Sequence, residues 1–212
     1  MNLFAQESVY FLTGKCGEGK SYMLKYLLTE CLKKRVFKFG LVFSQSALYN
    51  DDFNMVPKKY IVEGYNPEVL ESYINKIKQW RKQNGGKKAP PNFIVVDDIL
   101  GSMKDDHVWK SFISCHRHTS TYVFISTQYP ALISCMAREI VNYAFVFKQS
   151  SKQAINAIYK TIGGGADNER DFEQKLKQFT SEKYHCMLFN SRTDEYMEFS
   201  APNKIIKYNF KY

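Results

Sequence analysis

The residues from Gly14 to Ser21 have the types and spacing needed to bind the phosphates of a nucleotide. They read GKCGEGKS and satisfy the pattern G-x-x-x-x-G-K-[ST] at every fixed position. In such a loop, backbone N–H groups and the start of the next helix surround phosphate oxygens with positive potential. Lys20 is expected to reach the β- and γ-phosphates, and the Ser21 hydroxyl to bind Mg²⁺. The residues that we expect to contact ATP are Gly14, Lys15, Cys16, Gly17, Glu18, Gly19, Lys20, Ser21 and Tyr22.

Two adjacent carboxylates follow a continuous apolar run at Asn92 to Asp98, which reads NFIVVDD. We expect Asp97 to hold Mg²⁺ through water. Asp98 is placed to orient and deprotonate the attacking water, which needs a carboxylate close to the γ-phosphate. The alternative is a pair of acidic loop residues that cap the following helix. Two acids favour hydrolysis over nucleotide binding alone.

A second polar strand end occurs in Tyr122 to Pro130, which reads YVFISTQYP. Ligands bind at the carboxyl ends of strands in open parallel sheets. Gln128 is therefore expected to hydrogen-bond the attacking water or the γ-phosphate. The alternative is a helix cap followed by a solvent-facing glutamine.

Two arginines are candidates to neutralise charge in the transition state. Arg117 precedes the strand at Tyr122, and Arg138 follows it. Oligomeric motors often supply such an arginine from a neighbouring subunit. The alternative for either residue is a surface salt bridge. His116 and His118 flank Arg117 and are interpreted as polar loop residues, because the pattern HRH is not a metal signature.

The elements that must position these residues alternate between strand and helix periodicity. Strands are predicted directly before the phosphate loop, before the two acidic residues and before Gln128, and an amphipathic helix directly after the loop. A plain glycine turn would not explain the loop sequence in this context. Strands separated by helices imply parallel β-α-β units, so we expect an α/β three-layer fold with a mainly parallel sheet and a C-terminal β-hairpin. The predicted strands are 8–13, 36–44, 92–96, 122–126, 143–148, 184–189 and 195–199, and the predicted helices are 21–34, 66–83, 104–116 and 131–141.

The length and the charge of the chain indicate how many domains it forms and what kind of partner it binds. A length of 212 residues suits one compact domain, with a core at about 8–150 and an extension of a helix and the hairpin at 151–212. The formal charge of +9 is dispersed, which favours polyanions, nucleic acid first. Aromatic and basic residues that could follow a nucleic-acid backbone are Lys58, Lys59, Tyr60, Tyr65, Trp80, Arg81, Lys87 and Lys88. For Trp80, which recurs with Tyr73 at helical spacing, a position in the core is favoured.

The cysteines and the hydropathy indicate an intracellular protein. The five cysteines lie far apart, with no zinc-type spacing and no pattern of a disulfide framework. No segment approaches the roughly 18 apolar residues of a membrane span, and the start lacks the pattern of a secretory signal. We therefore expect a soluble protein with no membrane-spanning segment.

Three motifs in this order, GKCGEGKS, NFIVVDD and FISTQYP, resemble the FtsK/HerA superfamily of DNA-pumping P-loop ATPases. Within it, the pattern is most similar to the compact genome-packaging ATPases of double-stranded DNA viruses with large icosahedral capsids. The similarity runs from about Val9 to Lys148, and the hairpin around 184–199 also looks like their C-terminal strands. Much of the specificity lies in Gln128 and its spacing, because the phosphate loop alone occurs in many families.

The resemblance implies roles for this chain. Lys20 and Ser21 would bind phosphates and Mg²⁺, Asp97 and Asp98 would be the acidic pair, Gln128 the sensor glutamine and Arg117 the arginine finger. The family works as a pentameric or hexameric ring that hydrolyses ATP at subunit interfaces and threads double-stranded DNA into a preformed capsid. The implied partners are therefore DNA, further copies of the chain and capsid or vertex proteins. The implied location is the host-cell cytoplasm, the viral assembly site or the virion.

Other functions fit parts of the sequence. A P-loop small-molecule kinase would need a substrate pocket and a lid, for which Gly163 to Phe172 is the available segment. A nucleotide-dependent switch would hydrolyse ATP slowly and without stimulation by DNA. A superfamily motor used in conjugation or chromosome segregation would share the same motifs.

Overall fold

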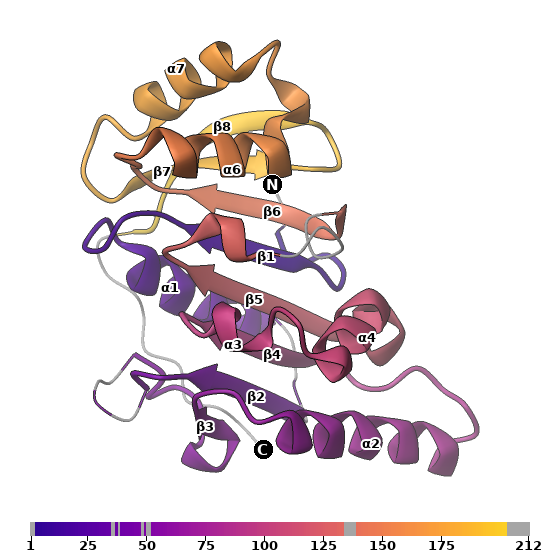
Figure 1. Ribbon diagram of the computed structural model, residues 1–212. Helices are drawn as coiled ribbons and strands as arrows, with labels where there is room; N and C mark the ends of the chain where they lie inside the picture. Colours follow the sequence, from indigo (N-terminus) through magenta and orange to yellow (C-terminus); the bar gives the residue numbers. More distant parts are fainter. Residues whose placement is uncertain are drawn as a thin grey trace.

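The computed structural model describes residues 3–34, 37, 39–47, 49, 52–133 and 139–202. In this part of the chain, eight strands form one sheet in the order β3-β2-β4-β5-β1-β6-β7-β8 (Figure 1). The strands from β1 to β6 pair in parallel, whereas β7 and β8 are antiparallel. The strands are β1 Val9–Thr13, β2 Phe39–Ser44, β3 Ile61–Glu63, β4 Asn92–Asp97, β5 Thr121–Thr127, β6 Val141–Val146, β7 His185–Asn190 and β8 Glu195–Ser200.

Helices connect the parallel strands and follow the last of them. The α-helices are α1 Lys20–Lys34, α2 Pro67–Gln83, α3 Leu100–Met103, α4 His107–Cys115, α6 Lys152–Ile162 and α7 Glu169–Phe179. Short 3-10 helices are η1 Lys58–Tyr60, η2 His116–Thr119, η3 Pro130–Leu132 and η4 Gly163–Gly165.

The sheet lies between two helical layers, each of which buries one apolar face. On one side α1 packs its buried residues, Leu24 and Leu28 among them, against Tyr10, Phe124 and Phe145 of the sheet. On the other side α2, α4, α6 and α7 cover the opposite face, as Figure 1 shows with α1 behind the sheet and α2, α4 and α6 in front. The predicted fold class, a three-layer α/β fold with a mainly parallel sheet and a terminal hairpin, is confirmed.

Two predicted helices differ from the structure. The helix predicted at 104–116 is only α4, because the Asp106 side chain accepts a hydrogen bond from Trp109 N and caps the helix there. The helix predicted at 131–141 falls largely on residues 134–138, outside the described part. Its last residue, Val141, instead begins β6.

Some elements were not predicted. The strand β3 has three residues, too few for a periodicity, and it pairs only with Val42–Ser44 of β2. The extension after β6 holds two helices where one was expected. Each begins at a polar cap, since Ser151 accepts from Ala154 N and Asn168 accepts from Asp171 N.

Candidate nucleotide-binding site

The phosphate loop lies between β1 and α1, at the edge where the parallel strands end, which we call the carboxyl edge. Phe147 N donates to Thr13 O at 2.8 Å and Lys15 N donates to Lys148 O at 3.2 Å, so the loop is attached to the chain that leaves β6. A Cβ on Gly14 would lie 2.5 Å from the Phe147 Cβ. The loop therefore packs against this chain more closely than any residue with a side chain would allow.

Lys20 points back into the phosphate loop. Its side chain is buried and its Nζ donates to Lys15 O at 3.1 Å. Burial lowers the pKa of Lys20, while the carboxylates of Asp98 and Asp97 act in the opposite direction. Ser21 is exposed on the first turn of α1, as a residue that meets a ligand must be. The assignment of Lys20 to the phosphates and of Ser21 to Mg²⁺ stays a prediction.

Asp97 is a buried carboxylate at the end of β4. The register places it between Ser44 of β2 and Ser126 of β5, and Ser44 Oγ donates to Asp97 Oδ2 at 3.0 Å. Burial, and secondly the charge of Asp98, raise the pKa of Asp97 to about 6. Sequence reasoning missed Ser44, although a polar residue at the end of a predicted strand was the same signal that identified Gln128.

Asp98 and Gln128 lie together. Asp98 Oδ1 accepts from Gln128 N at 3.0 Å, and Asp98 Oδ2 accepts from Gln128 Nε2 at 3.1 Å. Asp98 has a φ of 53° in the left-handed region, which turns the exposed carboxylate away from the direction of β4. Two residues that the sequence places 30 positions apart therefore form one polar unit.

The acidic pair has the chemistry of a magnesium site. Carboxylate and hydroxyl oxygens are the ligands that Mg²⁺ prefers, and Asp97, Asp98 and Ser21 supply them at one edge. In the described part of the chain, neither carboxylate forms an ion pair with a lysine or an arginine. Two adjacent carboxylates, one of which is buried with a raised pKa, suit a divalent cation.

Arg117 lies at the opposite edge of the sheet, where the parallel strands begin, which we call the amino edge. It is exposed in η2, directly before β5, whereas Gln128 follows the far end of that strand. A strand of this length spans about 20 Å, so Arg117 cannot approach the phosphate loop of its own chain. Arg117 and the phosphate loop of one chain therefore lie at opposite edges of the sheet. The other candidate, Arg138, lies outside the described residues.

A buried polar network holds the segment that carries Arg117. Asn92, the first residue of β4, donates from Nδ2 to Thr119 O at 2.6 Å and accepts from Tyr73 OH at 2.8 Å. His116 was interpreted as a polar loop residue, but it is buried, with its Nδ1 2.9 Å from Ile113 O. This segment is therefore fixed to β4 and α2 on its inner side.

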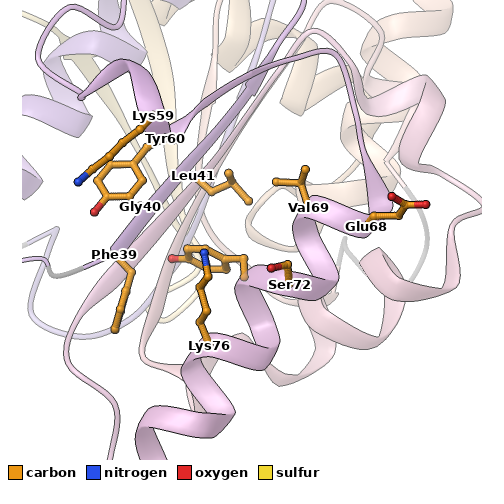
Figure 2. A pocket seen from close by; sticks show the side chains of 10 residues that line it. Phe39, Gly40, Leu41, Lys59, Tyr60, Glu68, Val69, Ser72 and Lys76 are labelled. Carbon is orange, nitrogen blue, oxygen red and sulfur yellow. The ribbon is translucent and has the colours of Figure 1, made fainter.

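Two of the grooves on the described surface concern the predicted sites. One, of about 430 Å³, adjoins the phosphate loop and is lined by residues including Lys15, Gln128 and Ser151. The other, of about 720 Å³, lies along the first half of β2, away from the nucleotide site. Figure 2 shows Lys59 and Tyr60 on one side of it and Lys76 of α2 on another.

The predicted aromatic and basic set does not form one surface. Lys59 and Tyr60 line the groove along β2, but the Tyr65 hydroxyl bonds to Asp106 at 2.6 Å. Trp80 is half-buried and packs against the core beneath α2. Near the amino edge, Arg81 Nη1 donates to His118 O at 3.3 Å, which links the end of α2 to η2.

Comparison with known proteins gives the family. The sequence profile described as "Poxvirus A32 protein" matches residues 1–183, most of the chain. The chain belongs to this family. A relative is the "Uncharacterized protein 075L" of Invertebrate iridescent virus 6, which is 25% identical over 187 residues, or 85% of this chain and 70% of the relative.

Solved structures share the fold of this family member. The genome packaging NTPase B204 from Sulfolobus turreted icosahedral virus 2, in complex with ATP-gammaS, has a TM-score of 0.68 at 16% identity, covering 94% of this chain and 98% of B204. The pCW3 conjugation coupling protein TcpA has a TM-score of 0.62 at 15% identity, covering 97% of this chain and 61% of TcpA. The fold is thus that of P-loop NTPases, as the three motifs predicted. In the described part of the chain, no helix combines the length and the apolar character that crossing a membrane requires.

Proposed function

We propose that this protein hydrolyses ATP with Mg²⁺ and uses the energy to move double-stranded DNA into a viral capsid. The observation that carries the hydrolysis is the Asp98–Gln128 pair, which lies at the same edge of the sheet as the phosphate loop. Membership of the poxvirus A32 protein family and the likeness to a viral genome packaging NTPase support the packaging role.

The mechanism follows from the charges at the carboxyl edge. The amides of the phosphate loop and Lys20 bind the phosphates, and the close packing of Gly14 on Phe147 keeps the loop in place. Mg²⁺, held by Ser21 and by Asp97 through water, would neutralise charge that develops on the phosphates. Asp98 accepts the proton of the attacking water, and Gln128, through its bond to Asp98, orients that water.

We propose that the site is completed by a second copy of the chain. Arg117 lies at the amino edge and is exposed, so a neighbour in a ring could present it to the phosphate loop. A pentameric or hexameric ring brings a carboxyl edge against the next amino edge at every interface, which is a heterologous contact that closes. Such a ring would dock on capsid or vertex proteins at the viral assembly site.

The DNA contact is proposed for the basic residues near the amino edge. We define the amino-edge cluster as Arg81, Lys82, Lys87, Lys88 and His118, without Arg117, which is assigned to the neighbouring site. Most of these side chains are exposed, and they come from the end of α2, the loop after it and η2. Lysine and arginine on one surface bind the DNA backbone without reading its sequence, which is what a translocase requires.

The test is steady-state ATP hydrolysis with and without long double-stranded DNA over a range of salt concentrations. We expect DNA to stimulate hydrolysis, and the stimulation to fall steeply with salt. A Lys82→Gln, Lys87→Gln variant should keep basal hydrolysis and lose stimulation, whereas Lys160→Gln, an exposed lysine on α6, should keep both. Hydrolysis that ignores DNA but responds to a small phosphate acceptor would overturn the motor and indicate a kinase.

The likeness to TcpA raises one alternative, a DNA motor that serves conjugation rather than packaging. Both motors would respond to DNA in the assay above. Copurification with capsid or vertex proteins from infected cells separates them, because only a packaging motor must dock on a capsid.

A further inference from the structure

The orientation of a bound nucleotide follows from the proposed function, on which this inference rests. The residues assigned to the γ-phosphate, Asp97, Asp98 and Gln128, follow β4 and β5, on one side of β1 in the sheet order. A triphosphate whose γ end faces that side must extend its ribose and base toward the other side, where β6, β7 and β8 lie. A surface that holds the base is therefore expected on that side.

Tyr184 lies there, directly before β7. Because β7 runs antiparallel to β6, its first residue lies at the carboxyl edge beside the phosphate loop. A Cβ built on Gly19, in the phosphate loop, would lie 3.0 Å from Tyr184 Cδ1. Tyr184 is nevertheless 53% exposed. An aromatic ring therefore adjoins the loop and still presents much of its surface to solvent.

The backbone of Tyr184 is held in an unfavourable conformation. Its φ is 69°, in the left-handed region that aromatic residues rarely adopt. Residues kept in such a conformation concentrate at ligand sites, because selection for stability alone would place glycine or asparagine there. The ammonium of Lys183 lies over one face of the ring, 5.0 Å from its centre, so a stacked base would use the other face.

A second tyrosine defines the other boundary of this region. Tyr22 follows Ser21 on the first turn of α1 and is 40% exposed. Its hydroxyl donates to Pro202 O at 2.7 Å, so the chain leaving β8 also reaches the start of α1. The segments before β7 and after β8 thus both return to the phosphate loop.

We propose that Tyr184 stacks on the base of the bound nucleotide, and that the β7–β8 hairpin supplies the base-binding wall of the site. Every base offers a π-face to such a ring, so stacking strengthens binding without choosing adenine over guanine. The hairpin thereby places an aromatic side chain at a position that no parallel strand of the described sheet reaches.

The experiment compares two probes by calorimetry with Mg²⁺ present: ATP, which has a base, and inorganic tripolyphosphate, which has none. We expect Tyr184→Asn to weaken ATP binding about tenfold, as loss of one base–aromatic stack does, and to leave tripolyphosphate binding unchanged. Tyr184→Phe should bind both as the wild type does. Tyr49→Ala, at a tyrosine that is 81% exposed on another segment, is the matched control.

Stability gives a second readout. Asparagine tolerates the left-handed conformation better than tyrosine, so Tyr184→Asn should melt at the same or a higher temperature while binding ATP less well. Equal weakening of ATP and tripolyphosphate would overturn the proposal, because Tyr184 would then act through Gly19 on the phosphates. Unchanged ATP binding would also overturn it. Failure of the wild-type protein to bind ATP at all would instead overturn the proposed function.

Discussion

Asp98 and Gln128 share two hydrogen bonds, so each holds the other in place for the attacking water. In the proposed mechanism Asp98 accepts the proton and Gln128 orients the water, so loss of Asp98 should lower the rate of hydrolysis more than loss of Gln128. We expect Asp98→Asn to bind ATP normally and to lower kcat by about 10²–10⁴, and Gln128→Ala to lower it less. Steady-state kinetics together with calorimetric ATP binding would measure this.

The double variant tests whether the two residues act as one unit. Residues in direct contact give non-additive effects, so Asp98→Asn with Gln128→Ala should be no slower than Asp98→Asn alone. Full activity of Asp98→Asn would show that another group accepts the proton.

In the absence of metal and nucleotide, Asp97 makes the stability of the protein depend on pH. Burial and the Asp98 charge raise its pKa from an ordinary 3.8 to about 6, so between these values the folded state holds a proton that the unfolded state has released. The free energy of unfolding therefore falls as the pH rises through this window. This loss of stability is at most about 3 kcal/mol, and it persists at neutral pH.

Asp97→Asn should remove this dependence. In the presence of a chelator, the variant should be more stable than the wild type at pH 7.5, and the two should converge below about pH 4, where both side chains are neutral. Chemical denaturation at several pH values measures the difference. Asp105→Asn, which changes an acid whose side chain is 91% exposed, should show neither effect. A difference between Asp97→Asn and the wild type that is independent of pH would contradict the assignment.

At the scale of elements, α4 depends on its cap. Asp106 Oδ1 accepts from Trp109 N at 2.8 Å and from Tyr65 OH at 2.6 Å, so one carboxylate both starts the helix and ties it to the loop before α2. Asp106→Ala should lower the free energy of unfolding by about 1–2 kcal/mol. Asp105→Ala, one residue earlier and outside the cap, should change it little. Equal effects of the two substitutions would mean that charge rather than capping matters.

The same elements show what the sequence could predict. The phosphate loop and the acidic strand end were predictable because short apolar strands ending in polar residues have a local pattern. The start of α4 was not, because periodicity extends through Lys104 and only the contacts of Asp106 end it. The two helices of the extension carry a readable pattern in Ile155, Ile158 and Ile162 and again in Phe172 and Leu176, which was overlooked.

Other features depend on contacts between distant segments. Tyr184 has no motif around it, and its place beside Gly19 follows from the antiparallel direction of β7. Arg117 stands close to Gln128 in the sequence but at the other edge of the sheet, because β5 separates them. A list of candidate residues therefore could not show which belong to one chain's site and which could serve a neighbour's.

For the whole molecule, the position of Arg117 predicts that two copies are needed for one active site. Arg117→Ala should bind ATP without hydrolysing it, and Lys20→Ala should lose binding or turnover. Mixed in equal amounts, they should regain activity, at most about a quarter of the wild-type rate, because only that share of interfaces pairs an intact Lys20 with an intact Arg117. Turnover of the mixture measures this.

The control is to mix each variant with itself, which should restore nothing. If the mixture stays inactive while both variants are folded and assembled, Arg117 does not act across an interface. The catalytic arginine would then be sought elsewhere, with Arg138 as the next candidate.

The Asn92 network has a mechanical consequence. The strand β4 carries Asp97 at one end and, through Asn92, holds the η2 backbone beside Arg117 at the other, about 17 Å away. A displacement of β4 when ATP binds would therefore move Arg117, which the proposed ring places at the site of the next subunit. Hydrogen exchange at the η2 amides, with and without ATP, would detect that movement, and an unchanged pattern would rule it out. Through β4, ATP binding in one subunit of the proposed ring would change the position of the arginine at the next site. The subunits could then hydrolyse ATP in sequence.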